Sequence, residues 1–174
     1  MNIDKKFRGN IYVVQNNRVV IEHVSGMADL ANEIPNTIDT KFASASAGKV
    51  FVAIAILQLI EQRKLNFEDT LGKLLDIDLH KIDVDVTVEQ LLNHTSGVPD
   101  YFDESIMDEY EKLWIEFPNY KIRHNNDHLI YFQGCDPGVS FISEYNPNNG
   151  MISVLVSNYG DNVWKEMRKI RENI

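Results

Sequence analysis

An apolar run at positions 50–60 is the feature that most limits how this chain can fold. Only Gln58 interrupts it. A helix that is apolar on nearly all sides is buried on all sides, so we expect residues 47–63 to form a helix packed inside the protein. The run is about half as long as a membrane span requires, and we therefore expect no membrane partner.

A serine and a lysine, Ser46 and Lys49, stand where this helix begins. Residues three apart lie on one helix face, with about 5–6 Å between their Cβ atoms. A helix N-terminus stabilises negative charge, and burial disfavours the ammonium form of a lysine. The pair predicts a nucleophilic serine with a lysine as its base. The alternative is a chance Ser-x-x-Lys, because the motif fixes only two positions.

Length and composition bound the class of protein. The chain has 174 residues, of which 44% are hydrophobic and 25% charged, as expected for one globular domain. A net charge of −9 disfavours nucleic acid as a partner. The single cysteine, Cys135, excludes an intrachain disulfide. The first residues carry no apolar leader segment, which favours a cytoplasmic protein.

Strand patterns occur near both ends of the chain, with helix patterns between and after them. β-Branched and aromatic residues on either side of Asn-rich turns predict two β-hairpins. Adjacent short strands favour an antiparallel sheet. The predicted fold class is therefore α+β, with one antiparallel sheet formed from both chain ends and helices packed on it. The predicted strands are 10–14, 18–24, 139–145 and 151–157, and the further predicted helices are 67–75, 88–92, 103–117 and 162–171.

Four stretches together resemble one known family. The chain resembles the serine β-lactamase and penicillin-binding protein superfamily, most closely the class C β-lactamase-like serine hydrolases. The most specific stretch contains Leu-Leu-x-His-Thr-Ser-Gly. The four stretches are 40–49 with the Ser-x-x-Lys motif, 59–69 after it, 86–101 with the Leu-Leu-x-His-Thr-Ser-Gly signature, and 136–158 with Asp-Pro-Gly followed by a hairpin.

The resemblance implies roles for named residues. Ser46 would attack a carbonyl, Lys49 would accept its proton, and the backbone N–H groups of Ser46 and Cys135 would hold the oxyanion. The family's third motif, Lys-Thr-Gly or His-Ser/Thr-Gly, would fall on residues 132–134, where only Gly134 is kept. Gln133 and Gly134 would then contact substrate, and the glycine would leave room for it. The implied substrates are a β-lactam, a D-Ala-type peptide or a small ester.

The departures from the family matter as much as the match. The family's second motif, Tyr-x-Asn or Ser-x-Asn, is absent from residues 1–174. We interpret the chain as one β-lactamase-like domain with an internal deletion near 129–132 that removes much of the helical domain. An impaired serine hydrolase is then the first hypothesis. A non-catalytic binding module or a truncated remnant is the alternative. Uncovered apolar surface would favour a homo-oligomer.

Other candidate residues carry less specific signals. His94 belongs to the Leu-Leu-x-His-Thr-Ser-Gly turn, where a histidine more often holds the loop than takes part in catalysis. Tyr101 or Tyr131 could replace the missing tyrosine, although packing is the commoner role. His124 and His128 are four apart, but no third ligand accompanies them. We therefore expect neither a metal site nor a cofactor.

Overall fold

The computed structural model describes residues 2–80, 82–98, 129–160 and 163–174. The chain divides into two compact units. One unit comprises Met1–Val52 together with Arg123–Ile174, and the other comprises Ala53–Ile122. The expected helix at 103–117, the histidines at 124 and 128 and Tyr101 lie outside the described residues. The interpretation as a single domain stays a prediction.

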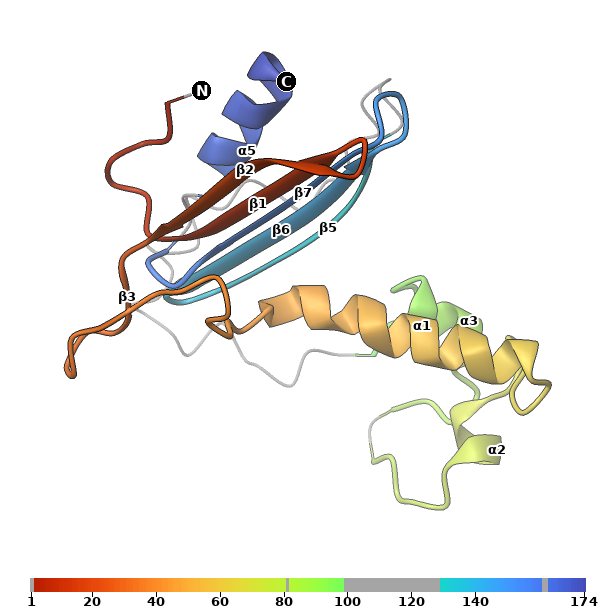
Figure 1. Ribbon diagram of the computed structural model, residues 1–174. Helices are drawn as coiled ribbons and strands as arrows, with labels where there is room; N and C mark the ends of the chain where they lie inside the picture. The colour runs from red at the N-terminus through yellow and green to blue at the C-terminus, as the bar shows by residue number, and fades with distance from the viewer. Residues whose placement is uncertain (1, 81, 99–128, 161–162) are drawn as a thin grey trace. The chain divides into compact units, whose positions relative to one another are not determined.

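A five-stranded antiparallel sheet forms the first unit, in the strand order β2-β1-β7-β6-β5 (Figure 1). The first strand of the N-terminal hairpin pairs with the second strand of the C-terminal hairpin, and Tyr12 lies opposite Val154. The prediction of an α+β fold with a sheet made from both chain ends is confirmed. The strands are β1 (Gly9–Gln15), β2 (Arg18–Ser25), β5 (Ile130–Asp136), β6 (Val139–Asn146) and β7 (Met151–Ser157).

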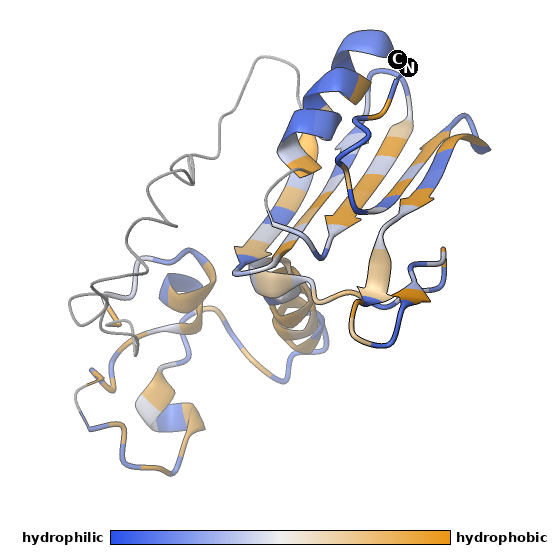
Figure 2. Cartoon of the chain, turned by 90° about the vertical axis from the view of Figure 1, so that its left-hand side faces the viewer, coloured by the Kyte–Doolittle hydropathy of each residue, from blue (hydrophilic) through white to orange (hydrophobic). Residues whose placement is uncertain are grey.

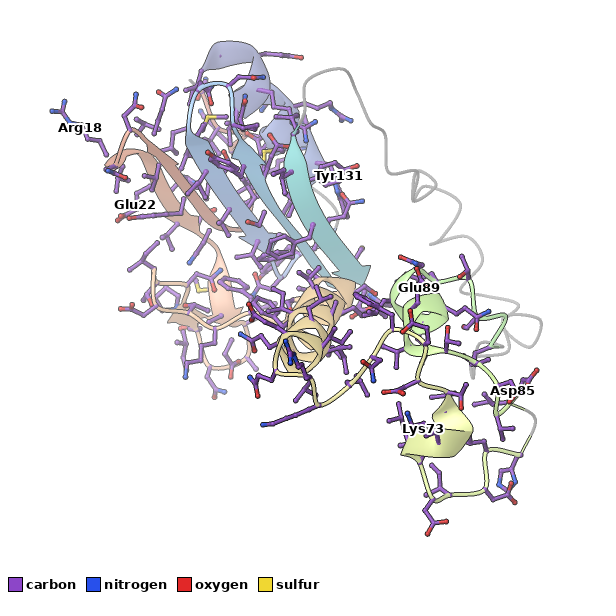
Figure 3. All side chains as sticks on the ribbon, turned by 90° about the vertical axis from the view of Figure 1, so that its right-hand side faces the viewer. Arg18, Glu22, Lys73, Asp85, Glu89 and Tyr131 are labelled. Atoms are coloured by element: carbon purple, nitrogen blue, oxygen red, sulfur yellow. The ribbon has the colours of Figure 1, made fainter. Side chains whose placement is uncertain are left out.

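The first hairpin follows from its turn residues. Asn16 and Asn17 have φ angles of 51° and 60°, the left-handed conformation that a two-residue hairpin turn requires and that asparagine tolerates. Arg18 and Glu22 project from β2, an edge strand of the sheet (Figure 3). Charged side chains on an edge strand oppose pairing with a further strand.

The C-terminal helix α5 (Val163–Asn173) covers one face of this sheet. Its buried residues Val163, Met167 and Ile170 recur at helical spacing, which places them in one apolar stripe. They join sheet residues in a single core, and Figure 2 shows the contrast between this stripe and the hydrophilic outer side of the helix. The sheet residues of the core are Ile11, Val13, Ile142, Met151 and Leu155, joined by Phe7.

A buried ion pair crosses the same interface. Glu144 on β6 has a side chain that is 1% exposed, whereas the Arg171 side chain on α5 is 35% exposed. Arg171 Nε donates to both carboxylate oxygens of Glu144, at 3.1 and 2.9 Å, and Arg171 Nη2 donates to one of them as well. This forked geometry satisfies a carboxylate that burial would otherwise destabilise.

Short elements missed by the periodicity arguments complete the first unit. Strands β3 (Met27–Asp29) and β4 (Ile34–Pro35) form a two-stranded sheet in a stretch outside the predicted strands and helices. Strands of two or three residues are too short for an alternating pattern to be recognised.

The second unit carries helices α2 (Leu71–Leu74) and α3 (Val88–Leu92). The predicted helix at 88–92 is present, and Thr87 caps it: the side chains of Thr87 and Gln90 form a reciprocal capping box. Lys73 donates to Asp69, and this hydrogen bond, followed by one from the Asn66 N–H, lowers the pKa of the buried Asp69 carboxyl. These local bonds fix the turn that leads into α2.

Helix α1 (Gly48–Glu61) begins in the first unit and ends in the second. The expected helix is present, but its predicted burial is wrong, because none of its residues is buried. Phe51 is 61% exposed and Val52 is 64% exposed. Figure 2 shows this helix as hydrophobic along its length. An apolar pattern identifies a helix that favours burial, but it does not identify the surface that would cover it.

Candidate active site

Ser46 lies in a 3₁₀ turn, η1 (Ala45–Ala47), directly before α1. The turn is closed by a hydrogen bond of 3.1 Å from the N–H of Ala47 to the carbonyl of Ser44. Ala45, the residue before the serine, has a φ of 48°, a conformation that is unfavourable for an alanine. Strained backbone of this kind clusters at functional sites, and here it sets the position of Ser46.

Lys49 is within hydrogen-bonding distance of Ser46. The Nζ atom of Lys49 donates to the Oγ atom of Ser46 at 2.9 Å, as the spacing of the motif predicts. An uncharged lysine in this place would accept the hydroxyl proton instead. Lys49 is exposed and Ser46 is half-buried, so the predicted burial of the lysine is wrong.

Gly134 on β5 packs directly against the turn that carries Ser46. A Cβ atom at this glycine would lie 2.5 Å from the backbone nitrogen of Ala47 and 2.8 Å from that of Ser46. Atoms at such distances overlap, so glycine alone fits at this position. The prediction that this space admits substrate is not met, because the backbone of the nucleophile's own turn fills it.

The two residues next to Gly134 on β5 direct their side chains to the opposite face of the sheet. Gln133 pairs with Ile142, and Cys135 pairs with Ser140, so their side chains lie on the sheet face that α5 covers. Gln133 Oε1 accepts a hydrogen bond of 2.8 Å from the indole of Trp164. The structure therefore does not bring the Gln133 side chain to Ser46. The Cys135 side chain is buried, and the role of its backbone N–H as an oxyanion donor stays a prediction.

Tyr131 shares the orientation of Gln133. Tyr131 lies on β5 (Figure 3) and pairs with Glu144 on β6, which places its side chain on the α5 face, opposite to the face that meets Ser46. The Tyr131 side chain is therefore not beside Ser46. His94 belongs to the second unit and has a φ of 56°.

Phe132 projects from the face of β5 that meets Ser46. Its ring lies 6.2 Å from that of Phe51 on α1 in an edge-to-face arrangement and 5.7 Å from that of Phe141 on β6. Both distances are in the range of favourable aromatic pairs. Sequence reasoning did not identify Phe51 and Phe141 as neighbours of the site, although the alternation of β5 and β6 around Gly134 could have located Phe141.

The described residues contain neither a cluster of metal ligands nor a membrane-spanning helix. No group of three or more histidine, cysteine, aspartate or glutamate side chains among them is arranged to hold a metal ion. Within the same residues, helices long and apolar enough to span a bilayer are also absent.

Comparison with known proteins identifies the family. A family model described as Beta-lactamase matches residues 6–161. Penicillin-binding protein 4* of Bacillus subtilis (strain 168) is 32% identical over 96 residues, which are 55% of this chain and 21% of that protein. Protein flp of Staphylococcus aureus (strain NCTC 8325 / PS 47) is 30% identical over 93 residues, 52% of this chain and 19% of that protein.

The fold has a counterpart among solved structures. The crystal structure of a penicillin binding protein from Bacillus halodurans superposes with a TM-score of 0.76 at 20% sequence identity, covering 97% of both chains. The chain belongs to the beta-lactamase family, within the serine β-lactamase and penicillin-binding protein superfamily. It matches only about a fifth of the length of the two relatives named above.

Proposed function

We propose that the chain is a serine hydrolase that forms an acyl-enzyme at Ser46 and releases the acyl group slowly. The observation that carries this proposal is the 2.9 Å contact between Lys49 Nζ and Ser46 Oγ. Nucleophile and base within hydrogen-bonding reach are the geometric requirement for this chemistry. The substrate would be a small molecule or peptide with a reactive carbonyl.

In the first step Lys49, uncharged, accepts the hydroxyl proton as the Ser46 oxygen bonds to the substrate carbonyl carbon. The backbone N–H groups of Ser46 and Cys135 are the candidates for holding the resulting oxyanion, and each such donor is worth about 2.7–4 kcal/mol in a transition state. The ammonium of Lys49 then returns the proton to the leaving group.

Slow release follows from what the sequence lacks. Hydrolysis of the acyl-enzyme requires a water molecule activated by a positioned base, and the resemblance assigns part of the proton transfer to a Tyr-x-Asn motif that residues 1–174 do not contain. General acid–base help is typically worth about 10²–10⁴-fold. The loss should slow the reaction least for substrates with good leaving groups, such as activated esters and strained β-lactams.

The test is intact-mass measurement after mixing with a chromogenic β-lactam and with a 4-nitrophenyl ester. We expect one acyl adduct, located on Ser46 by peptide mapping and absent from Ser46→Ala. Sustained multiple turnover that requires Ser46 would contradict slow release. The absence of both adduct and turnover would favour the alternative, a non-catalytic binding module or a remnant.

A further inference from the structure

Two side chains flank Gly134 on the face of β5 that meets Ser46. Side chains alternate along a strand, so Phe132 and Asp136 share the orientation of Gly134. Each stands about 6.5–7 Å from it along the strand. Because Gly134 packs on the backbone of Ser46, one neighbour of the nucleophile is aromatic and the other is acidic.

The aromatic side is an open surface. Phe132 contacts both Phe51 and Phe141, yet Phe51 remains largely exposed and Phe132 and Phe141 are only half-buried. All of these residues belong to the first unit, as do Ser46 and Gly134. An exposed aromatic cluster beside a nucleophile offers a contact surface for an apolar or aromatic group.

Asp136, the acidic neighbour of Gly134, repels anions. Asp136 is exposed at the end of β5 and lies within a Debye length of Gly134, about 8 Å at physiological salt. The protein's net charge of −9 adds repulsion at longer range. A carboxylate brought to this end of the site therefore meets a like charge.

Lys49 does not offset this repulsion while it serves as the base. Its Nζ atom is hydrogen-bonded to Ser46 Oγ, and it must be uncharged to accept the hydroxyl proton. In that state it offers a carboxylate no positive charge. Phe132, which stands where the resemblance expects a lysine or histidine, offers none either.

We infer that the site takes uncharged esters with an aromatic or branched apolar acyl group, and that it discriminates against substrates that carry a free carboxylate. This inference rests on the proposed function, since the same Ser46 would be acylated. The Ser46 oxygen bonds to the acyl carbon and the ester C–O bond breaks. The hydroxyl proton passes to Lys49, and the alkoxide or phenolate leaves. An activated phenolate needs no proton to leave.

The experiment compares two esters that differ by one charge, 4-nitrophenyl phenylacetate and 4-nitrophenyl (4-carboxyphenyl)acetate. We expect the 174-residue chain to be acylated at least tenfold faster by the neutral ester. In Asp136→Asn the ratio of the two acylation rates, neutral ester to charged ester, should fall by about fivefold. This is the effect of two unit charges roughly 7 Å apart at an effective dielectric constant near 50. Equal rates for the two esters would overturn the inference.

A matched control separates local from overall charge. Glu22 is exposed on β2, four strand spacings from β5, or roughly 19 Å, which is beyond the Debye length. Glu22→Gln removes the same charge and should leave the ratio unchanged. A ratio that falls equally in both variants would contradict a role for Asp136. Phe132→Leu should slow acylation by the neutral ester and by the charged ester alike.

A binding measurement keeps the inference separate from catalysis. Phenylacetamide and (4-carboxyphenyl)acetamide resist hydrolysis, and their binding to Ser46→Ala combined with Lys49→Met, which has no ammonium at the site, can be followed through the amide NMR signal of Gly134. We expect tighter binding of the neutral amide. No binding of it at millimolar concentration, or equal binding of the two, would overturn the inference. The expected preference in this double variant, combined with no adduct in the wild type, would instead overturn the proposed function alone.

Discussion

Lys49 Nζ lies 2.9 Å from Ser46 Oγ, although Lys49 itself is exposed. The two residues are held together by local geometry, because both belong to the same short stretch of η1 and α1. Their contact therefore depends on the turn that sets Ser46 and not on a surrounding pocket.

Replacing Lys49 should affect chemistry far more than stability. Lys49→Met keeps the length of the side chain but removes the base, so acylation of Ser46 should fall by about 10²–10⁴-fold. Because the side chain is exposed, the free energy of unfolding should change by less than about 0.5 kcal/mol. Burst kinetics with a 4-nitrophenyl ester and urea unfolding measure the two effects. Lys41→Met, at another exposed lysine, is the control, and equal acylation in both variants would exclude Lys49 as the base.

Gly134→Ala tests whether close packing sets the nucleophile's turn. The added Cβ would overlap the backbone nitrogens of Ala47 and Ser46, and we expect a loss of about 1–3 kcal/mol together with loss of the Ser46 adduct. Gly48→Ala is the matched control. Gly48 has a φ of −59° and only Ser44 Oγ near its Cβ position, at 3.4 Å, so alanine there should stabilise α1 by about 0.5–1 kcal/mol. Unchanged thermal unfolding of Gly134→Ala would contradict the packing argument.

Local signals in the sequence are sufficient to predict most strands of the sheet. The paired asparagines at 16 and 17 predict the first hairpin because few residues other than glycine tolerate their φ angles. Alternating burial on β6 and β7 matches the strands predicted at 139–145 and 151–157. Strand β5 is absent from the strands predicted above, because glycine and cysteine interrupt its alternating pattern.

The candidate site was predictable in part. The spacing of Ser46 and Lys49 determines their contact, since it depends on helix geometry alone. The orientation of the Gln133 side chain was not predictable, because it depends on how β5 pairs with β6 across the sheet. That pairing decides which face of β5 meets Ser46. The exposure of Lys49 and of α1 depends on what packs against them, which an apolar run does not specify.

Breaking the ion pair under α5 should destabilise the first unit. Arg171→Met would leave the buried carboxylate of Glu144 without its forked partner, at a cost of roughly 3–5 kcal/mol. Differential scanning calorimetry should show a clear drop in Tm. Arg168 is exposed on the same helix, and Arg168→Met should change stability by less than about 0.5 kcal/mol. If Glu144→Leu combined with Arg171→Met restores stability, the loss comes from the unpaired charge.

An apolar row crosses the sheet at the end of β5 where Ile130 lies. Ile130, Tyr145, Ile152, Val14 and Val19 occupy successive strands in register, and four of them are exposed while Val14 is half-buried. Exposed apolar patches mark interaction sites, and the homo-oligomer expected from the sequence stays a prediction that this row can test. Light scattering should show concentration-dependent association that Ile152→Lys weakens. Leu30→Lys, at an exposed position outside this row, should not weaken it, and a monomer at high concentration would contradict the prediction.

The contact between Asp4 and Lys165 ties the N-terminal segment to α5 and should make stability depend on pH. Lys165 Nζ donates to Asp4 Oδ2 at 2.6 Å, and the Lys6 N–H donates to Asp4 Oδ1 at 2.9 Å. These two hydrogen bonds, with that from Lys165 the larger cause, lower the pKa of Asp4 from 3.8 to about 2. The same pair raises the pKa of Lys165.

A lowered carboxyl pKa stabilises the folded state above the unfolded value of 3.8, and the stabilisation is lost as the pH falls through about 2. A raised lysine pKa acts in the opposite sense, so its contribution is lost only as the pH rises through the raised value of Lys165, above 10.5. Asp4→Asn should therefore lower the urea midpoint at pH 6, and the difference from wild type should close between about pH 4 and pH 2. Repeating the substitution in a Lys165→Met background isolates the pair, because most of the difference should then be absent at every pH. A difference that stays constant down to pH 2 would show that Asp4 stabilises the fold by some means other than its charge.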